Sequence, residues 1–155
     1  MLQMPKTIIS DTSCLIILTN IGELDLLHKV YGSIVTTIDI ATEYGEILPD
    51  WVIIEKVEDK LRQQLLEMQI DRGESSAIAL ALETPGCTVI LDDYKARKIA
   101  KQLGVNYTGT IGVIIKAKLS GVIPSIKPIL EKIKQTDFRL SSDIEQQALN
   151  AAGEI

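Results

Sequence analysis

The sequence predicts an α/β fold in which a mostly parallel sheet carries helices on both faces. Short runs of Ile, Val and Thr alternate with amphipathic helical stretches along the whole chain, and this alternation is typical of βαβ units, whose strands run parallel. Two of the apolar runs end directly on an acid, at Asp11 and at Asp92. The length of 155 residues suits one self-sufficient core, so we expect a single domain over residues 1–155.

The first half of the chain is expected to form three strands and four helices. β-branched residues place the strands at residues 6–10, 33–37 and 51–57. Apolar spacing and capping residues place the helices at residues 12–18 (capped by Thr12 and Ser13), 23–31, 39–48 and 60–69. In the last of these helices we expect Leu61, Leu65 and Met68 to face the core.

The second half continues the alternation. The helix at residues 74–83 is stopped by Pro85 and Gly86, and residues 88–91 form the clearest buried strand. Further elements are a helix at 94–103, a strand at 105–108 and, after the segment 109–112, a helix at 113–119. A helical tail is expected from about residue 123 to 155, with helices at 126–134 and from Ser142, where Ser142 and Glu145 read as a capping box, to near Gly153.

Composition points to a cytoplasmic globular protein. Apolar residues make up 46% and charged residues 24% of the chain, which is ordinary for a folded domain. Residues 1–10 lack the apolar core of about 7 to 15 residues of a signal peptide, and no stretch approaches the roughly 20 apolar residues of a membrane span. Cys14 and Cys87 have no metal or redox spacing and are expected as buried free thiols. The only histidine, His28, is expected at the surface.

The net charge of -5 at first argues against a nucleic-acid-binding protein, because such proteins gain affinity when Lys and Arg displace phosphate counterions. One explanation is that part of the negative charge surrounds a metal ion, which reverses the local field. The other explanation is an ordinary solvated surface. Composition does not choose between them.

Four acidic positions are placed so that they can converge. Ligands of open parallel sheets bind beyond the carboxyl ends of the strands, where the strand order reverses, and Asp11 and Asp92 occupy such ends. Glu43 and Glu74 lie in the first halves of two helices. If the two strands are neighbours, all four carboxylates gather at one edge, and their repulsion calls for a cation such as Mg²⁺ or Mn²⁺. For Asp11 or Asp92 taken alone, helix capping is the more common role.

The segments that carry these acids resemble a known family. The segments are Ile9-Ser10-Asp11-Thr12-Ser13, Ile40-Ala41-Thr42-Glu43, residues 73–81 and Ile90-Leu91-Asp92-Asp93-Tyr94-Lys95-Ala96-Arg97. In this order they resemble PIN-domain proteins, and most closely the VapC-like branch called DUF3368. That branch also shows Gly109-Thr110-Ile111-Gly112 and a helical tail with a segment like Phe138-Arg139-Leu140-Ser141. The resemblance covers nearly the whole chain.

The resemblance implies a PIN-like three-layer α/β/α fold and a Mg²⁺- or Mn²⁺-dependent ribonuclease that cleaves single-stranded or structured RNA, often as the toxin of a toxin–antitoxin pair. Asp11 carries over as the first metal ligand, Glu43 as the second acid and Glu74 as the third, where many PIN proteins have Asp. The fourth acid, also a metal ligand, is either Asp92 or Asp93; both are kept, with Asp92 preferred.

Polar and basic neighbours of these acids have two possible roles. Thr12, Ser13 and Thr110 either orient the carboxylates by hydrogen bonds or act only as helix caps. The basic residues of the helix after Asp93 either contact an RNA backbone or form an ordinary solvated face; these residues are Lys95, Arg97, Lys98 and Lys101.

Other classes of protein fit less well. A receiver domain needs a phospho-accepting Asp and a late Lys that the chain lacks in suitable places, and a haloacid-dehalogenase-type phosphatase needs a second Asp where Ser13 stands. A PIN-like RNA- or protein-binding module with weak catalysis remains an alternative. A cognate antitoxin or a second copy of the chain is an expected partner, because residues 15–18, Leu24 and Leu27 offer apolar surface, although burial in the core is the ordinary use of such residues.

Overall fold

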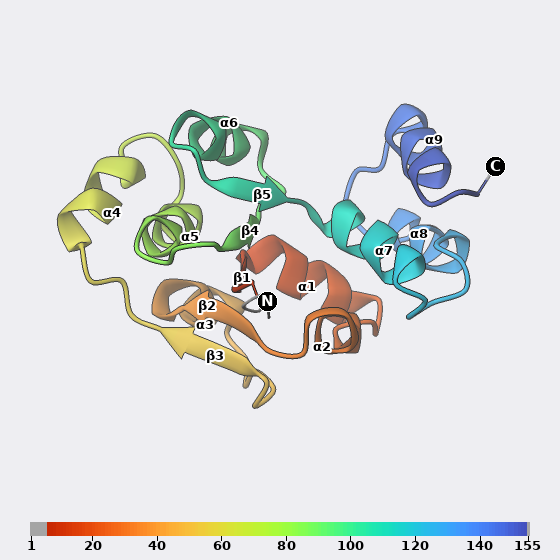
Figure 1. Ribbon diagram of the computed structural model, residues 1–155, viewed down its shortest axis with the longest axis horizontal. Coiled ribbons are helices and arrows are strands. Elements are labelled where there is room, and N and C mark those ends of the chain that lie inside the picture. The colour runs from red at the N-terminus through yellow and green to blue at the C-terminus, as the bar shows by residue number, and fades with distance from the viewer. Residues whose placement is uncertain (1–5, 155) are drawn as a thin grey trace, which may run out of the picture.

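A five-stranded parallel sheet forms the centre of the protein (Figure 1). The computed structural model describes residues 6–154. Residues 1–5 and 155 of the expected domain lie outside the described residues, and residues 1–5 are half of the segment 1–10 in which we expect no signal peptide. The strand order is β3-β2-β1-β4-β5, and every pairing is parallel. The strands are β1 (Ile8–Ser10), β2 (Ile34–Thr37), β3 (Val52–Glu55), β4 (Thr88–Ile90) and β5 (Asn106–Thr108).

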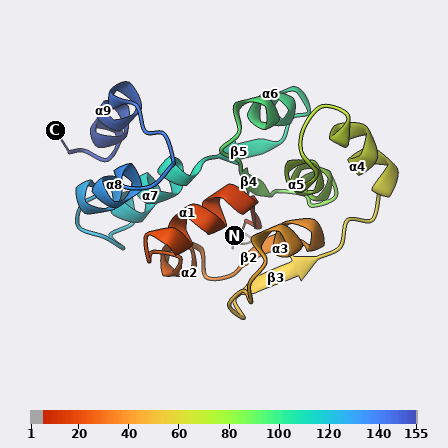
Figure 2. The same ribbon diagram turned by 180° about the vertical axis from the view of Figure 1, so that it is seen from behind.

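Helices cover both sides of this sheet, so the expected three-layer α/β/α fold is confirmed. In the described part of the chain they are α1 (Thr12–Asn20), α2 (Asp25–Tyr31), α3 (Ile38–Tyr44), α4 (Lys60–Glu67), α5 (Arg72–Leu82), α6 (Tyr94–Gln102), α7 (Thr110–Leu119), α8 (Lys127–Lys134) and α9 (Ser142–Ala151). Helices α4 and α5 lie to one side of the strands, while α1, α2 and α7 lie to the other (Figures 1 and 2). Helices α8 and α9 stack beyond α7.

The order of the strands reverses at β1. This strand pairs with β2 on one side and with β4 on the other, and its last residue, Ser10, lies opposite Ile90. The Asp11 N–H then donates to the Ile90 carbonyl at 3.1 Å. The strands that precede Asp11 and Asp92 are therefore direct neighbours, as the convergence of the acids requires, and both residues leave the sheet at the edge where parallel sheets bind ligands.

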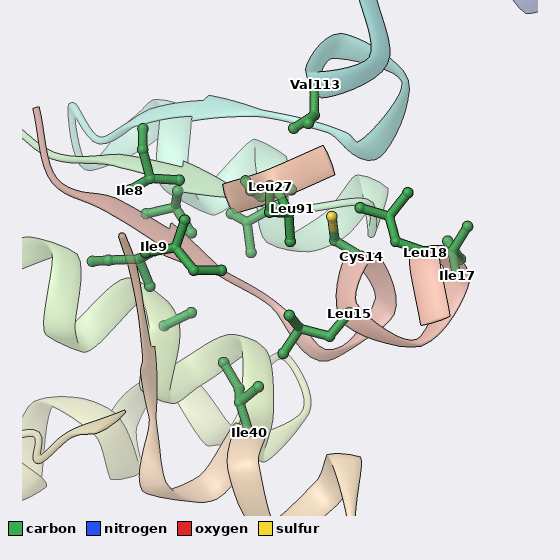
Figure 3. Close-up of a cluster of buried hydrophobic side chains, with 14 of the residues drawn as sticks. Ile8, Ile9, Cys14, Leu15, Ile17, Leu18, Leu27, Ile40, Leu91 and Val113 are labelled. Atoms are coloured by element: carbon green, nitrogen blue, oxygen red, sulfur yellow. The ribbon is translucent and has the colours of Figure 1, made fainter. Parts of the chain in front are cut away.

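The core packs between the sheet and α1, α2 and α7 (Figure 3). Ile9, Leu15, Leu18, Leu27 and Leu91 are all completely buried. The apolar surface of α1 is thus used by the core itself, and of residues 15–18 only Ile16 is exposed, at 39%. Cys14 and Cys87 are buried free thiols, as expected.

The expected core face of α4 is wrong. Leu61, Leu65 and Met68 are 66%, 57% and 81% exposed, whereas Gln63 and Leu66 are buried. The orientation of α4 about its axis is set by polar contacts, which the spacing of apolar residues does not predict. The Glu83 carboxylate accepts the N–H groups of Glu58 and Asp59 just before α4, and Gln63 Nε2 donates to Asp39 Oδ2 at 2.7 Å. A buried amide with a carboxylate acceptor is well tolerated, so Gln63 takes a place in the core.

Several helix ends also differ from expectation. Helix α1 is capped by Asp11, not by Thr12 or Ser13, since Asp11 Oδ1 accepts the Cys14 N–H at 2.9 Å. Helix α9 is capped by Ser141 one residue before the expected Ser142, and Glu145 is paired with Lys134 instead of closing a capping box. Helix α3 ends at Gly45 rather than near Leu48, because Gly45 adopts a left-handed conformation with φ of +79°.

Two further boundaries differ. Helix α7 begins at Thr110, three residues earlier than expected, so much of the segment 109–112 is helical. Residues 138–141 belong to the connection between α8 and α9 and not to a helix.

Strand β3 forms one edge of the sheet and is only partly covered. Val52 is buried, but Ile53 and Ile54 are 46% and 51% exposed. Because successive residues of a strand point to opposite faces, both faces of this strand carry an exposed isoleucine.

No helix within residues 6–154 is long and apolar enough to cross a membrane.

The corrected orientation of α4 predicts that two adjacent leucines contribute very differently to the stability of the protein. Leu66→Ala is expected to lower the free energy of unfolding by about 2–3 kcal/mol, because it leaves a cavity beside α5. Leu65→Ala, which changes an exposed side chain, is expected to stay within about 0.5 kcal/mol of the wild type. Urea unfolding followed by circular dichroism measures both, and a larger loss for Leu65→Ala would contradict the orientation of the helix.

Candidate active site

Asp11 is the most tightly held of the expected site residues. Its Oδ1 accepts the Cys14 N–H and its Oδ2 accepts the Asp92 N–H, both at 2.9 Å. The side chain is 2% exposed. One carboxylate therefore caps α1, spans the gap between β1 and β4 and has little freedom to turn.

A negative charge at Asp11 is costly in the metal-free protein. Burial, together with the nearby charges of Asp92 and Glu74, raises the pKa of the Asp11 carboxyl to about 8, despite the two N–H donors that lower it. A buried carboxylate with two acidic neighbours and no Lys or Arg partner among the described residues favours protonation or a bound cation.

Glu74 stands in the first turn of α5, which begins directly after Asp71. It is half-buried, and burial raises the pKa of its carboxyl to about 7, with Asp93, Asp71 and Glu43 adding to the rise. The charges that act on Glu74 thus come from the starts of α5 and α6 and from α3. This places the third expected acid among the other acids, as the sequence predicted.

Glu43 reaches the same place from α3. Glu43 is exposed, but its carboxylate lies over the start of α5. A Cβ atom on Gly73 would be 3.1 Å from Glu43 Oε1 and 3.4 Å from Thr12 Oγ1. Gly73 leaves the space that the carboxylate needs. Asp11, Glu43 and Glu74 together border one cavity of about 200 Å³, which Thr12, Ser13 and Ile16 complete.

The adjacent acids Asp92 and Asp93 have different surroundings. Asp92 Oδ1 accepts the Thr110 N–H at 2.8 Å and Asp92 Oδ2 accepts the Thr110 hydroxyl at 2.6 Å. Asp93 Oδ2 instead accepts the Ala96 N–H at 2.9 Å and caps α6. Asp92 acts on Asp11, and Asp93 acts on Glu74, so both acids border the group and the choice between them stays a prediction in favour of Asp92.

The three expected orienting residues have three different positions. Thr110 holds Asp92 through its backbone and its hydroxyl. Ser13 lines the cavity beside Asp11. Thr12 Oγ1 is buried and has no hydrogen-bond partner within the described residues, although it lies near the Glu43 carboxylate and Gly73. An unpaired buried hydroxyl at the wall of an acidic cavity is a place for a water or a hydrated ion.

A hydrated divalent cation fits this group of residues better than a fully protein-bound one. The donors are carboxylate and hydroxyl oxygens, which Mg²⁺ and Mn²⁺ prefer. Within residues 6–154, however, no three His, Cys, Asp or Glu side chains come close enough together to form a complete ligand group. Mg²⁺ keeps several waters and needs only one or two carboxylates, so the expected acids suit an ion held partly through water.

The basic residues of α6 divide into two kinds. Lys95, Lys98 and Lys101 are exposed and form no ion pair among the described residues. Arg97 is half-buried, donates from Nε to the Leu91 carbonyl at 2.6 Å and lies over the Tyr107 ring, with 5.6 Å from Cζ to the ring centre. The lysine side chains extend into solvent, whereas Arg97 connects Leu91, directly after β4, to Tyr107 of β5.

Sequence reasoning missed the contact that sets α3 against α5. Thr37 caps α3, and its hydroxyl is 2.6 Å from Ser76 Oγ, which donates to the Gly73 carbonyl at 2.7 Å. These buried hydroxyls join the helix of Glu43 to the first turn of α5, which carries Glu74. A Thr directly after a strand is a cap signal, but its partner on a distant helix is visible only in the fold.

His28 lies elsewhere. Its ring stacks on Trp51 with 5.1 Å between centroids, and it is exposed, as expected. It is not among the residues that border the acidic cavity.

The fold and the site define an α/β/α domain with acids at the reversal point of a parallel sheet, where such sheets bind ligands. Residues 7–154 match the family DUF3368, described as a PIN domain, and the chain belongs to this PIN-domain family. PIN domains are in general nucleases that use divalent metals. No curated protein and no solved structure gave a significant match.

The raised pKa of Glu74 predicts a pH-dependent stability of the metal-free protein. Between its ordinary pKa of 4.5 and about 7, the folded state holds a proton that the unfolded state releases, so stability falls as pH rises through this window. Glu74→Gln removes the charge and is expected to raise Tm at pH 8 by about 3 °C, as roughly 1 kcal/mol would do, with a much smaller change at pH 4.5.

Differential scanning calorimetry in EDTA measures these values. Adding Mn²⁺ is expected to stabilise the wild type at pH 8 more than Glu74→Gln, since the ion takes the place of the missing proton. Equal Tm values for the two proteins at pH 8, with and without Mn²⁺, would show that Glu74 is not under electrostatic strain.

Proposed function

We propose that this PIN domain is a Mg²⁺- or Mn²⁺-dependent ribonuclease that cleaves single-stranded or structured RNA. The observation that carries the proposal is the buried, immobilised carboxylate of Asp11 beside a small cavity that Glu43 and Glu74 also border, with Asp92 next to it. Such a group of acids is unfavourable without a cation, and in a nuclease a bound cation activates the phosphodiester for cleavage.

The residues divide the work as follows. Asp11 and Asp92 hold fixed oxygens, because each carboxylate already accepts two hydrogen bonds that set its orientation. Glu43 and Glu74 bring longer side chains to the cavity from two helices. When bound, the ion would polarise the phosphodiester and supply a hydroxide-like nucleophile. Lys95 and Lys98 lie exposed on the helix after Asp93 and attract the RNA backbone.

A PIN-like binding module with weak catalysis is the second candidate. The observation that favours it is the spacing of the acids, since no three of the described ligand-type side chains form a compact group. A binding module would retain RNA in the absence of metal and would leave it intact. The two functions therefore separate in a cleavage experiment with matched variants.

Cleavage of a labelled single-stranded RNA is expected with Mg²⁺ or Mn²⁺ and not in EDTA. Asp11→Asn and Glu74→Gln are expected to lower kcat/KM by more than about 100-fold, since even partners that only orient a ligand cost about 10–100-fold. Thr110→Val, which removes one hydrogen bond to Asp92, should fall in that smaller range. Glu46→Gln, an exposed acid just past α3, is the matched control and should cleave like the wild type.

Two outcomes would oppose the ribonuclease. Intact RNA after incubation of the folded wild type with either metal would leave only the binding module. Cleavage that survives Asp11→Asn would point to a contaminating nuclease or to another site.

We also propose a biological setting, based on the family: a cytoplasmic toxin restrained by a cognate antitoxin, with the chain itself a homodimer. An unrestrained ribonuclease harms its host, which is the reason for a partner. The exposed apolar row Leu61, Leu65 and Met68 on α4 supports contact with another chain better than the buried residues of α1 do, because exposed apolar patches mark interaction surfaces.

Expression in a bacterial host and a mass measurement test this setting. Induced wild-type protein is expected to arrest growth, whereas Glu74→Gln at the same level of soluble protein is expected to permit it. In analytical ultracentrifugation the wild type is expected to sediment as a dimer, and Leu65→Ser with Met68→Ser as a monomer. Growth that continues with active soluble enzyme speaks against a toxin, and a monomeric wild type speaks against the homodimer.

A further inference from the structure

A second cavity lies apart from the acidic one. It has a volume of about 380 Å³ and is formed by Arg97 of α6, β5, the first turns of α7 and one face of α9. The elements that line it can be found by their labels in Figure 1. Its lining residues include Arg97, Tyr107, Gly109, Ile111, Gln147 and Ala148. None of the acids discussed above borders this cavity.

One lining residue of this cavity lies beside Asp92. A Cβ atom on Gly109 would be 3.1 Å from Asp92 Oδ1 and would overlap Arg97 Nη2, so the absence of a side chain at Gly109 leaves room for the guanidinium and the carboxylate on the same side of its backbone. The next residue, Thr110, holds Asp92 through two hydrogen bonds. A ligand in the cavity therefore lies directly beside one of the proposed metal ligands.

The walls of the cavity combine planar, apolar and hydrogen-bonding groups. The Arg97 guanidinium is fixed by the Leu91 carbonyl and lies over the Tyr107 ring, and Tyr107 is itself 37% exposed. Ile111 and Ala148 supply apolar surface. The exposed Gln147 makes no hydrogen bond within the described residues, so its amide has both donors and an acceptor available.

This combination matches an unpaired nucleobase. Bases of single-stranded RNA stack on aromatic rings and on guanidinium planes, and their edges take hydrogen bonds from amide side chains. The volume lies in the range of about 300–1,000 Å³ typical of small-ligand sites. A purely apolar segment would leave the Gln147 amide without a partner, which is unfavourable on burial.

We propose that this cavity binds one unpaired base of the RNA, next to the phosphate that is presented to Asp11 and Asp92. The proposal rests on the proposed ribonuclease function and adds to it a site for substrate recognition. The base held between Arg97–Tyr107 and α9 sets the register of the strand, because Gly109, which lines the cavity, lies against Asp92 and fixes the place of the base relative to the acids. Base-paired RNA cannot supply such a base, so the site selects single-stranded segments.

RNA affinity with cavity variants of the full chain tests the proposal. The probe is a fluorescein-labelled eight-nucleotide single-stranded RNA in EDTA, which prevents cleavage, and the readout is fluorescence anisotropy. Tyr107→Ala is expected to raise Kd about 5- to 150-fold, the equivalent of the roughly 1–3 kcal/mol that one stacked base contributes. Tyr107→Phe keeps the ring and should bind within about twofold of the wild type.

Helix α9 offers a matched pair of variants. Gln147→Ala removes the amide inside the cavity and is expected to raise Kd several-fold, whereas Gln146→Ala changes a residue outside the cavity, paired with Asn150, and should bind like the wild type. Ala151→Trp fills the cavity and is expected to weaken binding as much as Tyr107→Ala. Gln147 and Ala151 are exposed, so these variants keep the test valid if Tyr107→Ala fails to fold.

A series of RNAs with one abasic nucleotide shows whether a single base is held. In the wild type, an abasic nucleotide at one position is expected to raise Kd by about the same factor as Tyr107→Ala does with the intact RNA. In the Tyr107→Ala variant, an abasic nucleotide at that position should not raise Kd any further. Equal abasic penalties in the two proteins, or unchanged Kd for Gln147→Ala and Ala151→Trp, would overturn the base site.

The cleavage assay keeps this inference distinct from the proposed function. Wild-type protein that cleaves RNA but shows no position-dependent abasic penalty would refute the base site alone. Protein that binds RNA with the expected penalty but never cleaves it with Mg²⁺ or Mn²⁺ would refute the ribonuclease alone. If both hold, Tyr107→Ala is expected to raise KM with little change in kcat, because it removes binding and not chemistry.

Discussion

The hydrogen bonds of the Asp11 carboxylate join the fold to the site. One oxygen caps α1 and the other accepts the N–H of Asp92 across the strand pair β1–β4. These bonds favour an ionised oxygen, yet burial and the neighbouring acids raise the pKa of the Asp11 carboxyl to about 8. The backbone N–H groups thus hold the Asp11 carboxylate in one position, whereas its burial and the neighbouring acids disfavour its negative charge. A bound cation would stabilise that charge. The position of the site is therefore set by the junction between β1 and α1, where Asp11 lies.

The sequence was informative wherever a backbone rule decides the outcome. Strands that end on Asp11 and Asp92 predicted acids at one edge, and the parallel topology makes those strands neighbours. It was misleading where distant polar groups decide. The outward turn of Leu61, Leu65 and Met68 depends on Glu83 and Asp39, which lie 24 or 25 residues in sequence from the groups that they bind. Apolar spacing on one helix cannot report such contacts.

The candidate site shows the same division. The positions of Asp11, Asp92 and Glu74 were predictable, because each follows a strand or lies in the first turn of a helix beside the reversal point. Glu43 was expected in the first half of its helix, but it is the sixth of the seven residues of α3 and reaches the cavity from the end of that helix. The distinct surroundings of Asp92 and Asp93 were not, since two adjacent acids have the same sequence context and differ only in which distant N–H each accepts. Arg97 was expected either to contact an RNA backbone or to lie on a solvated helix face, but it packs on Tyr107 and Leu91, and this packing gives the second cavity its planar wall.

The free edge at β3 has a consequence for how the protein behaves in concentrated solution. Its outer backbone groups have no neighbouring strand within residues 6–154, and Ile53 and Ile54 stand exposed on its opposite faces. An uncapped edge of this kind is a template for intermolecular strand addition, and the charges of Glu55 and Lys56, which follow the isoleucines, oppose it. Crowding thus favours open-ended sheet growth here, a process that competes with any closed, functional assembly of the chain.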